Sequence, residues 1–219
     1  DRDKVYTDPQ RFYAIYDRGV PIQNVKSQLV KQELELITTK TEDGNKTQRL
    51  TKGKLDIPYN HSEKPKYGWY MDLPEKGERV ISQAQFVRRT GLVLFSSIVP
   101  DLSVCSSGGE GWVMAVRLNG GNPKAGSYDV NGDGKVDKED VTRKGSPGGE
   151  DEAAAGTRVE GRGMPAGPKC FNNRCFTGTG AGGDDDGSDL PVTNTAHKGM
   201  GVAPKRQGRL SWEELQPRM

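Results

Sequence analysis

The sequence predicts an all-β fold built from short strands. Segments rich in aromatic and β-branched residues recur through the first two-thirds of the chain, and turns carrying Gly, Pro, Asn or Asp separate them. Closely spaced strands of this kind are typical of antiparallel sandwiches, barrels and propellers. Only 32% of the 219 residues are hydrophobic, while 29 are Gly and 13 are Pro, so much of the chain should be loop.

The first predicted strand, residues 11–17, has the sequence RFYAIYD and ends at a turn of Gly19, Val20 and Pro21. A helical turn is expected at residues 27–32, followed by a strand marked by alternation around Leu34, Leu36 and Thr38. Asp43-Gly44 is a hairpin signal, so a return strand should follow it. The remaining strands are expected at residues 68–74, 78–87, 91–99 and 111–118.

Residues 144–209 have a different character, because Gly, Ala, Asp, Pro and Thr dominate and large apolar side chains are few. Such a segment buries too little surface to offset its ordering entropy, so we expect a long Gly- and Asp-rich surface insertion. Residues 210–219 regain Trp212 and Leu215 and should dock back on the body as a strand or short helix. Residues 1–143 then form the main domain.

Charge and length limit the classes of function. The 32 basic and 30 acidic residues nearly balance and form no concentrated basic patch, which argues against nucleic-acid binding. No run approaches the ~20 apolar residues of a membrane-spanning helix. The chain begins at Asp1 without a signal peptide, and we therefore expect it to be a piece of a longer protein.

Residues 129–140, DVNGDGKVDKED, have the ligand spacing of an EF-hand calcium loop. Oxygen-bearing side chains occupy positions 1, 3, 5, 9 and 12, Gly134 stands at the sharp turn, and position 7 supplies a backbone carbonyl. Asp replaces the usual Glu at the last position. Hard oxygen ligands favour Ca²⁺ over zinc or copper. The predicted ligands are Asp129, Asn131, Asp133, Lys135 (through its carbonyl), Asp137 and Asp140.

The residues before this loop read as a strand and turns, without an entering helix. Calcium sensors act by changing the angle between two helices. We therefore expect the ion to hold a loop in place. The acidic run at residues 182–189 enforces no ligand spacing and is better explained as a solvated linker.

Three cysteines, Cys105, Cys170 and Cys175, leave an odd thiol if two are paired. Cys170 and Cys175 enclose four residues, and a local disulfide there would pin the loose tail. Three reduced cysteines in a cytosolic chain remain the alternative. His61 and His197 stand alone, no catalytic set is recognisable, and the three tryptophans are expected to be core anchors.

Several motifs in a fixed order resemble the C-terminal end of the PilY-type type IV pilus biogenesis proteins, the tip-associated adhesins. They are QRFYAIYD, GWYMDLPEKGERVISQAQFVRRTGLVLFSSIVPDLSVCSSGGEGWVMAVRLNGG, YDVNGDGKVDKEDV and GRLSWEEL. The likeness covers most of residues 10–142 and the last dozen, and residues 144–207 match no pattern of the family.

The resemblance implies that residues 1–143 are the last blades of a modified β-propeller. It implies a secreted or pilus-tip location after transit through the periplasm, and a calcium-binding, non-enzymatic role in pilus extension and surface adhesion. Its partners would be the remaining blades or N-terminal part of the parent protein and pilin or minor pilin subunits. A secretory location also permits a Cys170–Cys175 disulfide, with Cys105 free or bonded to a missing segment.

Two other classes compete with this assignment. A dockerin-like interaction module carries similar calcium loops, but in pairs and with helices. A quinone-dependent propeller dehydrogenase would show repeated Trp-docking motifs, which this sequence lacks.

If the chain holds only two or three blades, it should not fold alone. We then expect Phe86, Leu94, Phe95 and Val113 to lie bare on the outer blade faces.

Overall fold

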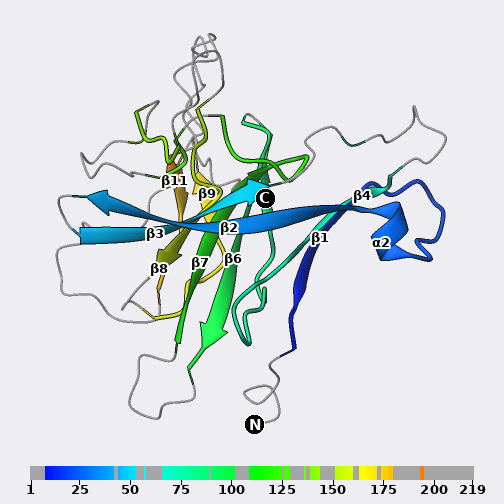
Figure 1. Ribbon diagram of the computed structural model, residues 1–219, viewed down its shortest axis with the longest axis horizontal. Helices are drawn as coiled ribbons and strands as arrows, with labels where there is room; N and C mark the ends of the chain where they lie inside the picture. The colour runs from blue at the N-terminus through cyan, green and yellow to red at the C-terminus, as the bar shows by residue number, and fades with distance from the viewer. Residues whose placement is uncertain are drawn as a thin grey trace, which may run out of the picture.

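The computed structural model of the chain describes residues 8–41, 44–52, 57, 66–88, 90–101, 109–124, 126–128, 136, 139–143, 151–159, 163–171, 174–179 and 193–194. These residues form a mostly β structure (Figure 1), as the sequence predicts. The elements are β1 (Arg11–Ile15), α2 (Val25–Gln28), β2 (Val30–Thr41), β3 (Gly44–Lys52), β4 (Gly68–Asp72), β5 (Gln85–Val87), β6 (Leu92–Pro100), β7 (Gly109–Arg117), β8 (Gly156–Val159), β9 (Lys169–Phe171), β10 (Arg174–Phe176) and β11 (Thr193–Asn194).

The described strands form two sheets. The main sheet has eight strands in the order β1-β4-β2-β3-β8-β7-β6-β5, and a small sheet has the order β11-β10-β9. All neighbouring pairs are antiparallel except β2 and β4, which run parallel. The expected division into separate propeller blades is therefore not seen in this part of the chain. The long hairpin of β2 and β3 pairs with β4 on one side and with β8 on the other, so the strands join in one sheet.

The main sheet curls around a hydrophobic core. Phe12 of β1 stacks on Phe95 of β6 with ring centroids 3.9 Å apart, although the two strands lie near opposite ends of the sheet. The buried residues of this core are Ile57, Trp69, Met71, Phe95, Trp112, Met114, Val116 and Ala155. A second cluster covers the other face of β6, β7 and β8 and contains Leu94, Val113, Ala115, Tyr128, Ala154, Val159 and Cys175.

The expectation of bare apolar faces was wrong for three of its four residues. Leu94, Phe95 and Val113 are each 0% exposed, whereas Phe86 is 50% exposed. The chain covers these side chains itself, because β1 folds over one face of β6 and the segment around Tyr128 covers the other.

Part of the expected surface insertion also lies in the core. Residues 153–155 are three fully buried alanines, and β8 lies between β3 and β7 inside the main sheet. The composition of residues 144–209 led to a wrong prediction here, because the position inside the main sheet requires small side chains. An added Cβ on Gly156 would lie 2.3 Å from the sulfur of Met114.

Two Gly-Trp pairs show how glycine lets strands approach closely. A Cβ on Gly68, whose φ is +138°, would lie 2.0 Å from the carbonyl oxygen of Ala14 on β1. A Cβ on Gly111 would lie 2.1 Å from the carbonyl oxygen of Ser97 on β6. The tryptophans that follow, Trp69 and Trp112, are fully buried, which confirms them as core anchors.

Local details differ from the expectation at two places. The helical turn spans Val25–Gln28 instead of 27–32, because the side chain of Asn24 accepts a hydrogen bond from the Ser27 amide and starts the turn earlier. Within the predicted strand 78–87 only β5 is a strand, and Arg79 makes an isolated bridge to Ile98. Nowhere in the described residues is there a helix of the length and apolarity that crossing a bilayer requires.

Candidate functional site

Most of the predicted calcium ligands lie outside the described residues. They are Asp129, Asn131, Asp133, Lys135 and Asp137. Also outside the described residues are the acidic run at 182–189, His61, His197, Cys105 and the segment 210–219. Asp140, the twelfth position of the loop, is described and is only 1% exposed. Among the described residues no group of three His, Cys, Asp or Glu side chains is placed to hold a metal ion. What the structure shows is how the two ends of the loop are held.

The first end is anchored by Tyr128. Its ring is 3% exposed and packs in the second cluster, and its hydroxyl donates a hydrogen bond of 2.8 Å to the carbonyl oxygen of Val113 on β7. Burial raises the pKa of the Tyr128 phenol well above its usual value, because the anion would lose its hydration. The hydroxyl therefore stays protonated and remains a donor at neutral pH.

The second end is anchored by residues 140–143. The hydroxyl of Thr142 donates a 3.1 Å hydrogen bond to Oε1 of Gln48 on β3. Arg143 forms ion pairs with Glu35 of β2 at 2.6 Å and with Glu152 at 3.1 Å. The hydrogen bond from Arg143, aided by one from Lys52, lowers the pKa of Glu35. This end is therefore held to β2 and β3.

Asp140 is the one predicted calcium ligand that lies within the described residues. Asp140 places a carboxylate in a buried position, and a buried carboxylate is stabilised by a cation or by hydrogen bonds. Tyr128, Glu139 and Asp140 are all outside helices. The described residues beside the loop therefore do not form the helix pair of a calcium sensor. The site-forming residues between them stay a prediction from the sequence.

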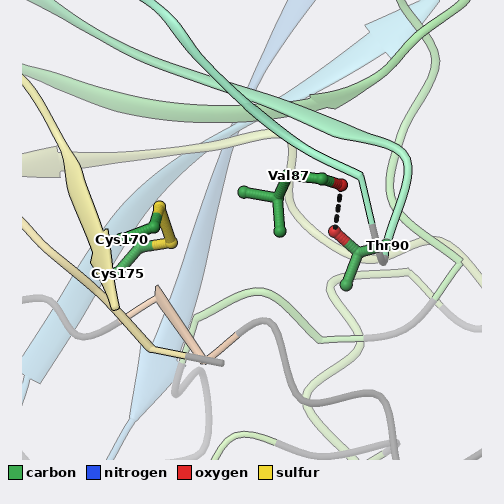
Figure 2. Close-up of a disulfide and its surroundings, with 4 residues drawn as sticks. All are labelled: Val87, Thr90, Cys170 and Cys175. Carbon is green, nitrogen blue, oxygen red and sulfur yellow. Dashed lines mark hydrogen bonds between the residues drawn. A yellow bond between two sulfur atoms is a disulfide. The ribbon is translucent and has the colours of Figure 1, made fainter. Parts of the chain in front are cut away.

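Cys170 and Cys175 form a disulfide (Figure 2) and are directly paired residues of β9 and β10. This is the pair that the sequence singles out. Cys175 is 1% exposed and packs in the second cluster, which also contains Tyr128 and borders Val87. The disulfide therefore joins the two strands of the small hairpin, and the packing of Cys175 places this hairpin against the second cluster.

A buried ionic network links β3, β6 and the turn after β4, and the sequence did not reveal it. The guanidinium of Arg49 forms two hydrogen bonds to the carboxylate of Glu78, at 2.6 and 2.9 Å, and the two side chains are 1% and 0% exposed. Ser97 of β6 donates a third hydrogen bond, of 2.5 Å, to Glu78. The central carbon of the Arg49 guanidinium lies 3.7 Å from the centre of the Trp112 ring, within the range of a cation–π contact.

Glu75 extends this network toward the surface. Its Oε1 accepts a 2.6 Å hydrogen bond from the indole of Trp112 and pairs with Arg158 of β8 at 3.2 Å. Arg158 also pairs with Glu110 of β7 at 2.7 Å. Because every charge has an opposite partner, the arrangement fits a structural clamp better than a reactive site.

One sequence signal pointed toward the network. Glu78 belongs to the Gly-Glu-Arg triplet of the motif GWYMDLPEKGER, whose glutamate is the buried partner of Arg49. Its partner lies 29 residues earlier, at a separation that no local pattern specifies. The motif thus marks a residue of importance without identifying its contact.

Comparison with solved structures gives an informative likeness. No family model matches the chain, and no curated protein matches it in sequence. Among solved structures, the chain is similar to the crystal structure of the Pseudomonas aeruginosa PilY1 C-terminal domain, with a TM-score of 0.60 and 17% identity. The match covers 84% of this chain and 37% of that chain, so the chain spans well under half of the structure it resembles. On this structural match, the chain has the fold of the PilY1 C-terminal domain.

Proposed function

We propose that this chain is part of a PilY1-like protein that supports the assembly of type IV pili and surface attachment. The observation that carries the proposal is the fold shared with the PilY1 C-terminal domain, together with the ordered motifs of the PilY-type family in the sequence. The role is structural and adhesive instead of enzymatic.

The match to 37% of a longer chain supports partners within the same protein. In this proposal the present chain contacts other domains or an N-terminal part of the same protein, and pilin or minor pilin subunits contact the assembly at the pilus tip. The Cys170–Cys175 disulfide supports an oxidising, extracytoplasmic location, since such bonds persist there.

The test is genetic. Deleting the gene that encodes this chain, in its own organism, should lower the number of surface pili seen by electron microscopy, and the intact gene should restore them. Unchanged pilus numbers and unchanged attachment to surfaces after deletion would refute the assignment.

We further propose that residues 129–140 bind one Ca²⁺. Asp129, Asn131, Asp133, Asp137, the carbonyl of Lys135 and Asp140 would supply oxygen ligands at about 2.3–2.6 Å. The buried position of Asp140 supports this assignment.

Isothermal titration of the native chain and of Asp133→Ala tests the calcium site. The native chain should bind one equivalent of Ca²⁺, and the variant should bind it much more weakly because a central ligand is lost. Glu139→Ala, at an exposed position between ligands, is the matched control and should bind like the native chain. Equal calcium binding by Asp133→Ala and the native chain would eliminate the site.

A further inference from the structure

The hairpin of β2 and β3 is open along one side of β2. β2 runs from Val30 to Thr41, but only Val30, Lys31 and Gln32 pair with β4. β3 pairs with β2 on its other side, along Glu33–Thr41. The far end of the hairpin, at left in Figure 1, extends past β7 and β8. Among the described strands, none therefore pairs with residues 33–41 on the side where β4 ends.

The contacts of β3 show which backbone groups of β2 point toward this open side. The side chain of Asn122 accepts a 2.6 Å hydrogen bond from the Thr51 amide and donates a 3.1 Å hydrogen bond to the Thr51 carbonyl. Both backbone groups of Thr51 therefore point away from β2. Leu34 is opposite Thr51, and the two residues of such an antiparallel pair direct their amides and carbonyls away from each other. Leu34 and every second residue after it thus direct these groups toward the open side.

These residues are Leu34, Leu36, Thr38 and Lys40, and no residue in the described part of the chain bonds to their outward amides and carbonyls. Leu34 packs against the hydrophobic core, whereas Leu36 is 60% exposed and Thr38 and Lys40 are also exposed. No carboxylate of the described residues forms an ion pair with Lys40. An apolar, a β-branched and a cationic side chain therefore follow one another along this free edge.

We propose that residues 34–40 of β2 bind an extended segment of a partner protein as an added antiparallel strand. Backbone hydrogen bonds give such an added strand its affinity, and alternate side chains give it specificity. Antiparallel pairing is slightly more stable per residue than parallel pairing. A lysine on a free edge opposes indiscriminate pairing, so the partner must bring a carboxylate to Lys40.

The side chains of β2 define the sequence of the partner. An antiparallel segment, followed from its N-terminus, meets Lys40 first, then Thr38 and then Leu36. The matching segment carries an acidic, a β-branched and an apolar residue at alternate positions in that order. This binding edge belongs to the hairpin and does not depend on a role of the chain in pilus assembly.

The probe for this edge is the synthetic peptide Thr-Glu-Thr-Val-Thr-Leu-Thr, titrated into the full chain while amide hydrogen exchange is followed by NMR. At a free peptide concentration ten times Kd, exchange at Leu36, Thr38 and Lys40 should be about tenfold slower than without peptide. Exchange at β1 should not change. A peptide with Lys in place of Glu, or with Pro in place of Val, should bind about tenfold more weakly, because it loses the charge pair or a backbone donor.

Two proline variants separate the open side of β2 from the rest of the hairpin. Thr38→Pro removes an outward amide but no hydrogen bond to β3, and it should weaken peptide binding about tenfold or more. Asn45→Pro is the matched control, because Asn45 is opposite Lys40 on β3 and its amide points away from β2. This control should bind the peptide like the native chain.

A charge reversal tests the same edge without altering the backbone. Lys40→Glu should bind the Lys peptide more tightly than the Glu peptide, the opposite of the native preference. Because it changes only an exposed side chain, it decides the question even if Thr38→Pro does not fold. The proposal is overturned if the native chain does not bind the Glu peptide, if Lys40→Glu keeps the native preference, or if exchange slows at β1 instead of at residues 34–40. Equal peptide binding by a folded Thr38→Pro would overturn it as well.

Discussion

Arg49 and Glu78 show how the fold keeps two full charges out of water. Their side chains are 1% and 0% exposed, and two hydrogen bonds join the guanidinium to the carboxylate. A buried pair of this kind adds little net stability compared with apolar residues of the same size. Losing one partner, however, leaves the other charge buried without a counter-charge. The network is thus a place where single substitutions have large effects.

Glu78→Gln should lower the free energy of unfolding by about 3–5 kcal/mol, because the Arg49 charge would remain buried without a carboxylate. Urea denaturation measures the effect. The control Glu33→Gln changes a glutamate whose side chain is 66% exposed and 3.8 Å from Lys31, and it should leave stability unchanged. Equal midpoints for native protein and Glu78→Gln would contradict the role given to this pair.

Tyr128 gives a prediction for alkaline pH. Its pKa is raised in the folded state, while the unfolded state ionises near pH 10. Above pH 10 the unfolded state therefore binds fewer protons than the folded state, and stability falls as the pH rises. Tyr128→Phe should cost about 1 kcal/mol at pH 7 through its lost hydrogen bond, yet lose less further stability between pH 9 and about 11. Parallel pH profiles for the two proteins would contradict this account.

At the scale of elements, glycine decides how closely two pairs of strands approach each other. Gly68 of β4 faces the backbone of β1, and Gly111 of β7 faces the backbone of β6. The nearest atom that a new methyl group would meet is in both cases a backbone carbonyl oxygen, which cannot move aside as a side chain can. Both glycines precede a buried tryptophan, so the close approach and the core anchor come from adjacent residues.

Gly68→Ala and Gly111→Ala should each destabilise the protein by about 3 kcal/mol or more, since the added Cβ overlaps a neighbouring strand. Thermal unfolding followed by circular dichroism measures the loss. Gly178→Ala is the matched control, because nothing lies within 4 Å of its added Cβ, and it should change stability by less than about 0.5 kcal/mol. A tolerated Gly111→Ala would mean that β6 and β7 do not approach as the structure shows.

The hairpin of β9 and β10 gives a second element-scale prediction. Its disulfide closes a loop with a sequence separation of 5, and the chain-entropy relation gives about 2 kcal/mol for a loop of that size. Adding reductant should therefore lower the unfolding temperature of the native chain. It should have no such effect on Cys170→Ser/Cys175→Ser, and an equal response of both proteins would show that the hairpin does not depend on this bond.

Strand β8 shows where composition stops being informative. Residues 153–156 are three alanines and a glycine, a sequence that carries almost no hydrophobic pattern. Gly156 lies against the side chains of Met114 and Arg49, which come from strands far away in the sequence and leave no room for a side chain at that position. A local pattern cannot express that requirement, so the sequence placed this strand on the surface.

For the whole molecule, the sequence predicted which segments are strands better than how they combine. β1, β4, β6 and β7 lie where alternation and turn residues put them, because strand formation leaves a local pattern. The parallel pairing of β2 with β4 and the insertion of β8 between β3 and β7 are long-range events with no local signal. The predicted calcium loop combines both situations. Its ligand spacing is a local pattern that the sequence shows, whereas the contacts of its flanking residues with Val113 and Gln48 are long-range and leave no pattern.

Among the described strands, β1 stands at one edge of the main sheet, and this edge has apolar character. β1 pairs with β4 alone among the described strands, and Tyr13, Ile15 and Tyr16 are 40%, 56% and 51% exposed. A free strand edge flanked by exposed apolar side chains is a site for pairing with another chain. The opposite edge, β5, has only three residues, and short edge strands pair poorly.

The chain by itself should therefore self-associate through β1. Sedimentation velocity of the chain should show a concentration-dependent shift from monomer to larger species. Tyr13→Lys should move this shift to higher concentration, because a lysine on an edge strand opposes pairing. Leu118→Lys replaces an apolar residue that is 58% exposed but lies in a turn, and it should associate like the native chain. If Tyr13→Lys associates as strongly as the native chain, the contact does not involve β1, and the open edge must be covered by other residues of the same molecule.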